Sequence, residues 1–409
     1  MRILVVASHE PWPLNSGGRL RLHNFLRWLG QDAAVTLVLP EKSQHTEHLP
    51  TPIDVVDAIA SSVSAKHNHL NTVARAVRRH FGYSPALFYW LADNATPARY
   101  DVALLFGAVT GQYTDAVRVP VVWDAVDELV LYTARDVARC GVRDWPRTAR
   151  AATLYALFER HVARRSYASV FASPLDASYA RRWAGGTRIE SISNGVDFDY
   201  FCPSHEPAEP GTVAFVGSLS FPPNVEAIVR FAKRIWPRIR ADHPDRQLLV
   251  VGRAPVPAVA ELAGRPGVRV HADVPDVRPY LARAAVVVVP TRLGGGVKNK
   301  VLEACAMARP VVASPRALAG LTARPGIDVV CASHPPDWVK LVSHLLKQPR
   351  TAAQVARHGH EWVRRMHNWP CLAGQLKELL ASAAADGLRR PEKRPCPSIR
   401  WNAQPTCAL

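Results

Sequence analysis

Short apolar runs alternate with amphipathic stretches along the first half of this chain. Five runs have the length and composition of buried strands: Arg2–Ala7, Val35–Leu39, Val102–Phe106, Val119–Trp123 and Ser169–Ala172. Between the first two, Leu20, Phe25, Leu26 and Leu29 recur at roughly helical spacing. This strand–helix rhythm predicts a doubly wound parallel sheet.

The same rhythm begins again after residue 212, with six further strand candidates: Val213–Val216, Gln247–Val251, Val268–His271, Ala285–Val289, Val311–Ala313 and Val329–Cys331. A turn and a proline-rich polar stretch separate the two halves, as linkers do. A chain of 409 residues is long enough for two domains. We therefore expect Rossmann-like domains over 1–193 and 213–365, joined by a linker over 194–212. A helix over 366–385 is expected to return to the N-terminal domain, and 386–409 to form a disordered tail.

One strand–loop–helix–strand segment in the second half carries the most specific chemistry. A glycine triplet, Gly294–Gly296, follows the apolar run 285–290 and precedes an amphipathic helix. Glycines let backbone N–H groups converge on an anion, and a helix N-terminus adds partial positive charge. Lys298 and Lys300 add formal charge. This loop is therefore predicted to bind phosphate.

The helix after the glycine triplet also brings a carboxylate to the loop. Glu303 lies four residues after Asn299 and three after Lys300, so the three share one side of the helix. A carboxylate one turn beyond a phosphate site can accept hydrogen bonds from ribose hydroxyls, which favours a nucleotide diphosphate over free phosphate. The alternative is that the triplet is only a tight turn and that Glu303 is a surface carboxylate paired with Lys300.

A second glycine pair, Gly17 and Gly18, follows the first strand of the chain. In open α/β sheets, ligands bind beyond the carboxyl ends of the strands. Two such domains facing each other enclose a cleft, and we expect the two glycine loops to face each other across it. His9 and His23 lie near the first loop and are candidates for substrate contact, although each is equally typical of a structural or solvated histidine.

Charge and cysteine content narrow the range of functions. The seven cysteines are scattered and lack a CxxC pair, which indicates a reducing cytoplasm and argues against a cysteine zinc site. No apolar run approaches the ~20 residues that span a bilayer. The net charge of +17 favours anionic partners. The chain carries no zinc finger, basic zipper or aromatic RNA-binding signature, so nucleic acid is not expected among them.

Two segments rich in arginine and histidine, 64–98 and 135–168, have interleaved apolar residues and look helical. They are either solvated outer helices or a basic surface that faces the acceptor or an acidic membrane. We therefore expect a cytoplasmic protein, with peripheral association at the inner face of the cell membrane as an open alternative.

With these residues assembled, the chain resembles the family-4 retaining glycosyltransferases of the GT-B fold. The resemblance runs to about residue 380 and is strongest over 191–320. Ile192–Pro203 is similar to the interdomain segment of that family. The other similar segments are Phe215-Val216-Gly217, Leu248–Gly252, Val274–Leu281 and Lys298–Ala304. The last two, with Pro222–Val225, are most similar to sugar transferases of bacterial exopolysaccharide clusters. The implied fold is two Rossmann-like doubly wound domains facing each other across a cleft.

The resemblance assigns donor-binding roles one position at a time. Glu303 matches the second glutamate of the family's Glu-x7-Glu motif, which binds the donor ribose, whereas the first glutamate position falls on Gly295. Backbone amides of Gly295 and Gly296 are expected to contact the donor instead. Val274 and Pro275 match the loop beside the nucleotide base.

Further roles follow where the chain departs from the family pattern. The family's arginine and lysine after Phe-Val-Gly are replaced by Ser218–Pro222. The residues expected to bind the donor phosphates are therefore Gly17, Gly18, Arg21, Arg292, Gly295, Gly296, Lys298, Asn299 and Lys300. The family's histidine near the reacting sugar has Asp127 as its best match and Asp124 as the second, and the alternative for either aspartate is a helix N-cap.

The implied reaction is transfer of a sugar, with retention and without a metal, from a nucleotide-diphosphate donor, a UDP- or GDP-sugar, to an acceptor hydroxyl. The acceptor is a sugar, a lipid-linked glycan or a small molecule, and no resident cofactor is implied. The expected setting is exopolysaccharide or glycoconjugate biosynthesis. Alternatives are a natural-product glycosyltransferase, a sugar-nucleotide epimerase with the same cleft, and a catalytically degenerate nucleotide-binding protein.

Overall fold

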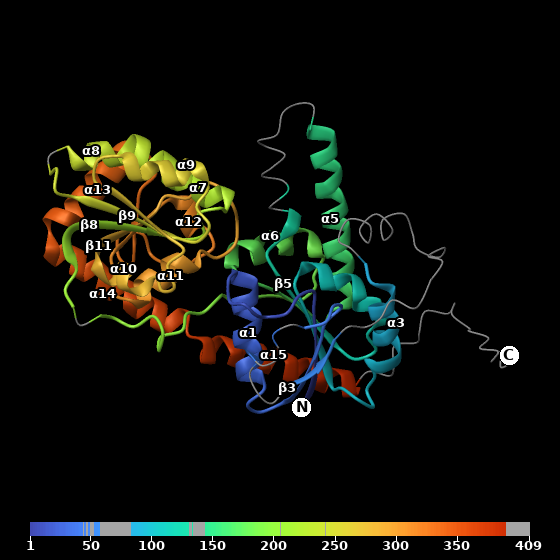
Figure 1. The fold of residues 1–409 in the computed structure, drawn as a ribbon. Helices are drawn as coiled ribbons and strands as arrows, with labels where there is room; N and C mark the ends of the chain where they lie inside the picture. The colour runs from blue at the N-terminus through green and yellow to red at the C-terminus, as the bar shows by residue number, and fades with distance from the viewer. Residues whose placement is uncertain are drawn as a thin grey trace, which may run out of the picture.

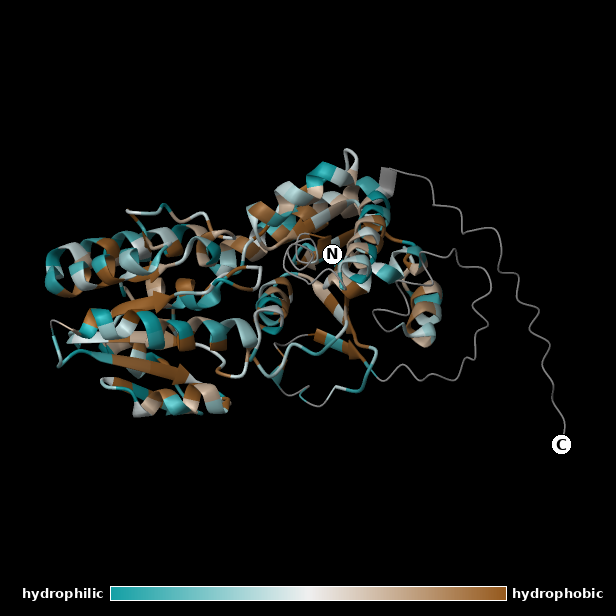
Figure 2. Ribbon diagram, turned by 90° about the horizontal axis from the view of Figure 1, so that it is seen from above, coloured by the Kyte–Doolittle hydropathy of each residue, from teal (hydrophilic) through white to brown (hydrophobic). Residues whose placement is uncertain are grey.

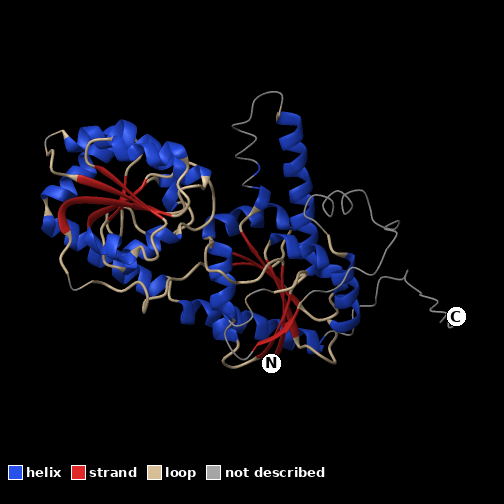
Figure 3. Cartoon of the chain, in the orientation of Figure 1, coloured by secondary structure: helices blue, strands red, loops and turns tan. Residues whose placement is uncertain are grey.

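The computed structural model describes residues 1–43, 45, 48–49, 53–57, 83–130, 133, 144–204, 206–241 and 243–389. These residues form two α/β lobes, each built around one parallel sheet (Figures 1 and 3). The α/β class with two parallel sheets, expected from the sequence, is therefore confirmed. Of the stretches predicted to be helical, 64–98 and 135–168, residues 64–82 and 135–143 lie outside the described residues, as does the predicted tail from residue 390 onward; the described remainders contain helices Pro85–Asn94 and Trp145–Arg165.

The N-terminal sheet has seven parallel strands in the order β3-β2-β1-β4-β5-β6-β7. They are β1 (Arg2–Ala7), β2 (Ala34–Val38), β3 (Ile53–Val56), β4 (Val102–Phe106), β5 (Val121–Val126), β6 (Ala168–Phe171) and β7 (Ile189–Ser191). The register pairs Val5 with Leu37 on one side and with Leu104 on the other. The strand predicted over Val119–Trp123 begins two residues later, at Val121, and its extended run reaches Val126.

Helices cover both faces of this sheet. One face packs against α1 (Gly17–Leu29) and α15 (Trp369–Arg389). The other packs against α3 (Pro85–Asn94), the 3-10 helix η2 (Ala108–Ala116), α5 (Trp145–Arg165) and α6 (Pro174–Ala184). Because both faces are covered, the strands read as continuous apolar runs, which Figure 2 shows as brown arrows.

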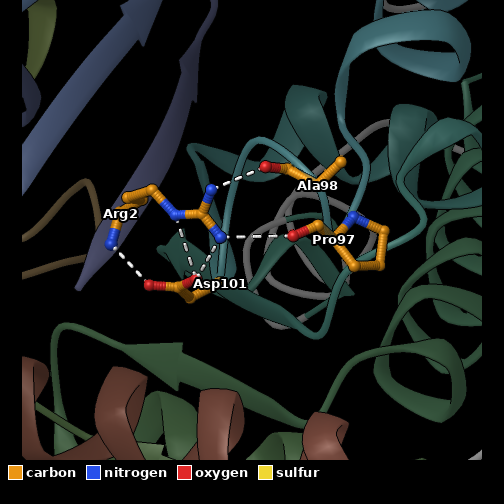
Figure 4. A network of polar contacts seen from close by, with 4 residues as sticks. All are labelled: Arg2, Pro97, Ala98 and Asp101. Atoms are coloured by element: carbon orange, nitrogen blue, oxygen red, sulfur yellow. Dashed lines mark hydrogen bonds and ion pairs between the residues drawn. The ribbon is translucent and has the colours of Figure 1, made fainter.

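The start of β1 is attached to the segment that precedes its neighbouring strand β4 by a surface network (Figure 4). The Arg2 guanidinium donates to both Asp101, at 2.7 Å, and the carbonyl of Ala98, at 2.6 Å. Asp101 also accepts from the backbone N–H of Arg2 at 2.8 Å. The two side chains are 46% and 36% exposed, so water competes for these contacts.

The C-terminal sheet has six parallel strands in the order β10-β9-β8-β11-β12-β13. They are β8 (Glu209–Val216), β9 (Gln247–Gly252), β10 (Val268–Ala272), β11 (Ala284–Val289), β12 (Val311–Ala313) and β13 (Val330–Cys331). One face packs on α10 (Arg278–Arg283), α11 (Asn299–Ala306), α12 (Pro315–Leu318) and α14 (Pro349–Met366). The other packs on α7 (Pro222–Arg230), η3 (Phe231–Ile235), α8 (Trp236–Arg240), α9 (Pro257–Ala260), η4 (Glu261–Gly264) and α13 (Pro335–Lys347).

The chain crosses between the lobes twice, and the crossings lie side by side. The backbone N–H of Val196 donates to the carbonyl of His367 at 2.9 Å, and a hydrogen bond of 2.7 Å joins His367 Nδ1 to the carbonyl of Asn194. Burial lowers the pKa of His367 to about 4, so the ring is neutral near pH 7 and Nδ1 donates. A Cβ on Gly195 would lie 2.6 Å from the Trp369 ring, so this close packing requires glycine.

Two segment boundaries differ from the sequence-based expectation. Residues 209–212, placed in the linker, form the first part of β8, because the sheet continues beyond the proline-rich stretch. Helix α15 begins at Trp369 and runs to Arg389, so residues 386–389 are helical and not part of a tail. The apolar side of α15 packs against α1 and β4 in the N-terminal domain. No helix among the described residues is long and apolar enough to cross a membrane.

Candidate functional site

A cavity of about 400 Å³ opens between the two domains at the carboxyl ends of both sheets. In each sheet the strand order reverses beside the first strand, between β1 and β4 and between β8 and β11, and such crevices are where α/β sheets bind ligands. The lining residues are Leu14–Gly18, Leu20, Val126, Asp127, Ala172, Asn194, Val216–Ser218, Phe221, Pro223, Asn224, Thr291, Gly295–Lys300 and Glu303.

The cavity gathers most of the residues selected from the sequence and leaves five outside its lining. Those that line it are Gly17, Gly18, Asp127, Gly295, Gly296, Lys298, Asn299, Lys300 and Glu303. Those that do not are Arg21, Asp124, Val274, Pro275 and Arg292. The two glycine loops, one per domain, face the same space. Their roles toward a ligand stay predictions.

The glycine loop of the C-terminal domain is held open by its own conformation. Gly294 and Gly296 have φ of +81° and +66°, a region that favours glycine. The Arg316 guanidinium donates to the carbonyl of Gly294 at 2.7 Å, and the Lys298 ammonium donates to the carbonyl of Gly295. Helix α11 then starts at Asn299, and its first residues line the cavity. Because no side chain caps this N-terminus, its backbone N–H groups and the positive end of the helix dipole remain available there.

Glu303 and Lys300 lie on the cavity side of α11, and both are half-buried. Burial raises the pKa of the Glu303 carboxyl to about 7, with Lys300 opposing that rise. Burial also lowers the pKa of the Lys300 ammonium to about 7, with Glu303 opposing and the like charge of Lys298 reinforcing the shift. Glu303 is thus a half-buried carboxylate, and the surroundings of both groups disfavour their charged forms.

The N-terminal domain supplies a carboxylate from a strained turn. Val126 ends β5 with φ of +67°, which a β-branched residue adopts rarely, and the N–H of Asp127 donates to the carbonyl of Ala125 at 2.9 Å. This tight turn places Asp127 in the cavity, against the Gly294–Gly296 loop. A Cβ on Gly296 would lie 2.5 Å from Asp127 Oδ1, so only glycine leaves room for the carboxylate there.

The charge state of Asp127 depends on its enclosure. Burial raises its pKa to about 6, and the nearby carboxylate of Asp176 adds to the rise, while Lys298 and Arg21 oppose it. The carboxyl group is therefore half protonated near pH 6, a higher pH than for an exposed aspartate. A group with that pKa can accept a proton from a hydroxyl near neutral pH.

Arg21 and Asp124 form an ion pair with each other and do not line the cavity. Arg21 Nε donates to Asp124 Oδ2 at 2.9 Å, and both side chains are 0% exposed. Arg21 Nη1 donates to the carbonyl of Ser193 at 3.0 Å and to Asn194 Oδ1 at 3.1 Å. The arrangement braces α1, β5 and the interdomain segment. A phosphate role for Arg21 or a catalytic role for Asp124 would require this buried network to rearrange, and the buried Arg21 Nη2 has no hydrogen-bond partner among the described residues.

The other outlying predictions have simple structural explanations. Arg292 is exposed and does not line the cavity. Val274 packs against the core beneath α10, and Pro275 is exposed beside it, so their assignment to the nucleotide base rests on the resemblance alone. His9 and His23 do not line the cavity either, and burial lowers the pKa of both rings.

The structure adds residues that the sequence reading did not select. Asn194 Nδ2 donates to Asn299 Oδ1 at 3.1 Å, which joins the interdomain segment to the start of α11. Asn224, at the first turn of α7, accepts from Lys300 Nζ at 2.8 Å. Asn224 belongs to the Pro-Pro-Asn-Val phrase, which signalled resemblance but no role. Only the fold brings the loop after β8 against α11.

Comparisons with known proteins agree with this architecture. Residues 210–348 match the family model described as glycosyl transferases group 1, and no curated protein matches the chain. Sucrose-phosphate synthase from Thermosynechococcus elongatus superposes with a TM-score of 0.69 at 16% identity, over 94% of this chain and 99% of that one. Anabaena HepE in complex with UDP and glucose gives 0.64 at 13%, over 93% and 100%. S. aureus TarM in complex with fondaparinux, α-GlcNAc-glycerol and UDP gives 0.67 at 9%, over 93% and 99%. The chain therefore has the GT-B glycosyltransferase fold, with a group 1 domain in its C-terminal half.

Proposed function

We propose that this protein is a glycosyltransferase that moves a sugar from a nucleotide-diphosphate donor to an acceptor hydroxyl, with retention and without a metal. One observation carries the proposal. Glu303, the N-terminus of α11 and the two glycine loops converge on a single interdomain cavity. Neighbours of the same fold bind UDP and sugars, which supports a donor of this class, with a UDP-sugar the first to test.

The half of the cavity formed by the C-terminal domain would hold the donor. The half-buried Glu303 would accept hydrogen bonds from the ribose hydroxyls, and backbone amides of Gly295 and Gly296 with the N-terminus of α11 would bind the diphosphate. Negative charge grows on the phosphate oxygens as the bond to the sugar breaks. Fixed N–H donors and lysine cations at that point stabilise the transition state more than the ground state.

The half formed by the N-terminal domain would hold the acceptor. Asp127 lies against the donor loop, where the acceptor hydroxyl must approach the reacting sugar carbon. In a retaining reaction the leaving phosphate can take the acceptor proton, and the Asp127 carboxylate would orient the hydroxyl and stabilise positive charge on the sugar ring. Enclosure between two domains limits attack by water.

The acceptor we propose is a sugar or a lipid-linked glycan of exopolysaccharide or glycoconjugate assembly. Helix α5 supports a location at an acidic membrane surface. It carries arginines along its length, and Trp145 and Leu157 are 56% and 46% exposed. Co-sedimentation with phosphatidylglycerol vesicles but not with phosphatidylcholine vesicles is the expected result. Equal recovery with both would favour a small-molecule acceptor in the aqueous phase.

The test of the donor site is calorimetric titration with UDP, GDP, ADP and TDP in the presence of EDTA. Saturable binding of one nucleotide, lost in Glu303→Ala and kept in Glu261→Ala, an exposed glutamate of the same domain, is the expected result. Binding without turnover of any nucleotide sugar would support the degenerate alternative. The observation that favours this alternative is Gly295, which occupies the position of the first glutamate in the Glu-x7-Glu motif of the family that the chain resembles. No binding at all would refute the proposal.

A further inference from the structure

A lysine reaches the switch point of the C-terminal sheet from an unexpected element. Lys300 belongs to α11, yet its ammonium lies beside the loop that follows β8, where Nζ donates to Asn224 Oδ1 at 2.8 Å. Asn224 is 7% exposed, and its Nδ2 donates to the carbonyl of Ser218 at 2.9 Å. That second bond fixes which amide atom faces the lysine, since an ammonium can only donate.

The space for this contact is provided by Gly217. A Cβ at that position would lie 2.5 Å from Lys300 Nζ and 2.9 Å from Asn224 Nδ2. Lys300 Nζ also lies 4.7 Å from the centre of the Phe215 ring, a favourable cation–π distance. Phe215, Gly217 and Asn224 therefore form a fitted seat for one ammonium group at the end of β8.

Neighbouring cations of the loop are engaged elsewhere. Lys298 donates to the carbonyl of Gly295, Arg316 to that of Gly294, and Arg230 to that of Pro290 at 2.6 Å. These contacts shape the loop backbone. Asn224 is a neutral partner and uses one of the three N–H groups of Lys300, so the lysine retains donors for a ligand in the cavity that it lines.

The charges that face Lys300 come from two residues. Glu303 on α11 favours its ammonium form, and Lys298 at the start of that helix disfavours it. The contacts from α7 and β8 are the neutral Asn224 and Phe215. Lys298 opposes the attraction of Glu303, so the ammonium lacks a full counter-charge, and a negatively charged phosphate would supply it.

We propose that Asn224 is a positioning residue that fixes the Lys300 ammonium at the crevice between β8 and β11, where Lys300 binds the β-phosphate of the donor. This lysine would take the place of the arginine and lysine that the resembling family carries after its Phe-Val-Gly strand. The inference rests on the proposed function and deepens it by naming the cation that binds the diphosphate. Because the pKa of Lys300 lies near 7 in the empty site, binding of a diphosphate would be coupled to proton uptake above that pH.

The experiment compares a nucleoside diphosphate with its monophosphate, using UDP and UMP first and the base selected by calorimetry thereafter. Asn224→Ala is expected to weaken UDP binding about 10-fold and UMP binding less than about 3-fold, as loss of one polar positioning contact would. Lys300→Met should lower UDP affinity further and remove most of the UDP preference. Lys233→Met, which deletes an exposed lysine of the same domain, should change neither affinity.

The pH dependence of the UDP and UMP affinities distinguishes a positioning role of Asn224 from a role in folding. In the wild type, the ratio of UDP to UMP affinity should fall as pH rises from about 7 to 9, because Lys300 loses its proton and Glu303 affects both ligands alike. Asn224→Asp should shift that fall to higher pH, since a carboxylate favours the ammonium. Lys300→Arg should flatten the profile, because arginine keeps its charge.

The outcomes also separate this inference from the proposed function. If wild-type protein binds none of the nucleotides, the proposed function fails and the inference fails with it. If UDP binds, and Glu303→Ala abolishes binding, but the Asn224 and Lys300 variants keep the wild-type ratio and its pH profile, only this inference is overturned. A pH-independent ratio in the folded wild-type protein would overturn it as well.

Discussion

Two pairs of oppositely charged residues lie at the carboxyl ends of the strands, one in each domain, and they differ in burial and in their hydrogen-bond partners. In the N-terminal domain, Arg21 and Asp124 are 0% exposed and form a direct ion pair of 2.9 Å. In the C-terminal domain, Lys300 and Glu303 are half-buried, line the cavity, and have pKa values displaced toward 7. Similar topology thus carries one closed charge pair and one open one.

The difference lies in the hydrogen-bond partners of each cation. Arg21 is enclosed by Asp124, Ser193 and Asn194, so the charge serves to join α1 to the interdomain segment. Lys300 has a neutral amide as its partner, and its charge stays available at the cavity. A buried pair that is removed on one side leaves an uncompensated charge, whereas an open pair mainly loses ligand affinity. Stability should therefore respond to the first pair and binding to the second.

The largest expected effect is on folding, from Arg21→Met. It leaves Asp124 buried beside an apolar chain and opens the contacts to Ser193 and Asn194. We expect the free energy of unfolding to fall by about 3–5 kcal/mol, measured by urea denaturation. The control is Arg27→Met, which removes an exposed arginine of the same helix. A loss equal to that of the control would mean that the closed pair contributes nothing to stability.

The second effect is on binding, from Glu303→Ala. We expect affinity for the preferred nucleoside diphosphate to fall about 10- to 100-fold, because charge-assisted hydrogen bonds to the ribose are lost. The same titration on the nucleoside-free diphosphate should change far less. If Glu303→Ala lowers the urea midpoint of unfolding as much as Arg21→Met does, Glu303 stabilises the fold and the proposed contrast with the Arg21–Asp124 pair is wrong.

The third effect is on turnover, from Asp127→Asn. We expect kcat to fall about 10- to 100-fold with donor affinity within about 3-fold of wild type, because the carboxylate acts after the donor is bound. In the wild type, kcat/KM should decline as pH falls below about 6, where Asp127 becomes protonated, and this decline should be missing from the variant. The exposed Asp93→Asn is the matched control. Full activity in Asp127→Asn would remove this residue from the reaction.

The smallest effect is expected at the surface network of Figure 4. Arg2→Ala deletes an ion pair whose side chains are 46% and 36% exposed, and exposed pairs contribute about 0.2–1 kcal/mol. Urea denaturation alongside Arg21→Met tests the comparison directly, since both changes remove an arginine from a carboxylate at 2.7–2.9 Å. Equal losses would contradict the claim that burial sets the difference.

The fold was largely readable from local pattern. Buried parallel strands are continuous apolar runs, and amphipathic helices between them carry a helical period, so β1, β4 and β11 stand out without any tertiary information. The errors were two missed strands, β3 and β7, which have only four and three residues, and several element boundaries. The start of β8 and the end of α15 are set by how far neighbouring elements continue to pair or pack, which composition does not encode.

The candidate site was readable only in part. A glycine triplet and a carboxylate at helical spacing from Asn299 and Lys300 indicate an anion site from local geometry alone. Whether a given charge faces the cavity depends on partners distant in sequence. Arg21 looked as suitable as Lys300, but Asp124, 103 residues away, forms an ion pair with its guanidinium, whereas Asn224, 76 residues from Lys300, accepts one hydrogen bond from the ammonium.

The amino-acid order therefore determined the layers, the strand polarity and the presence of two glycine loops at strand ends, since each follows from local periodicity and backbone freedom. Tertiary structure alone decided which charges remain open. Packing brings α1 against β5 and α11 against the loop after β8, and it sets the burial and hydrogen-bond partners of every ionisable group there. Burial and hydrogen-bond partners control whether a charged group stabilises the fold or remains available to bind a ligand.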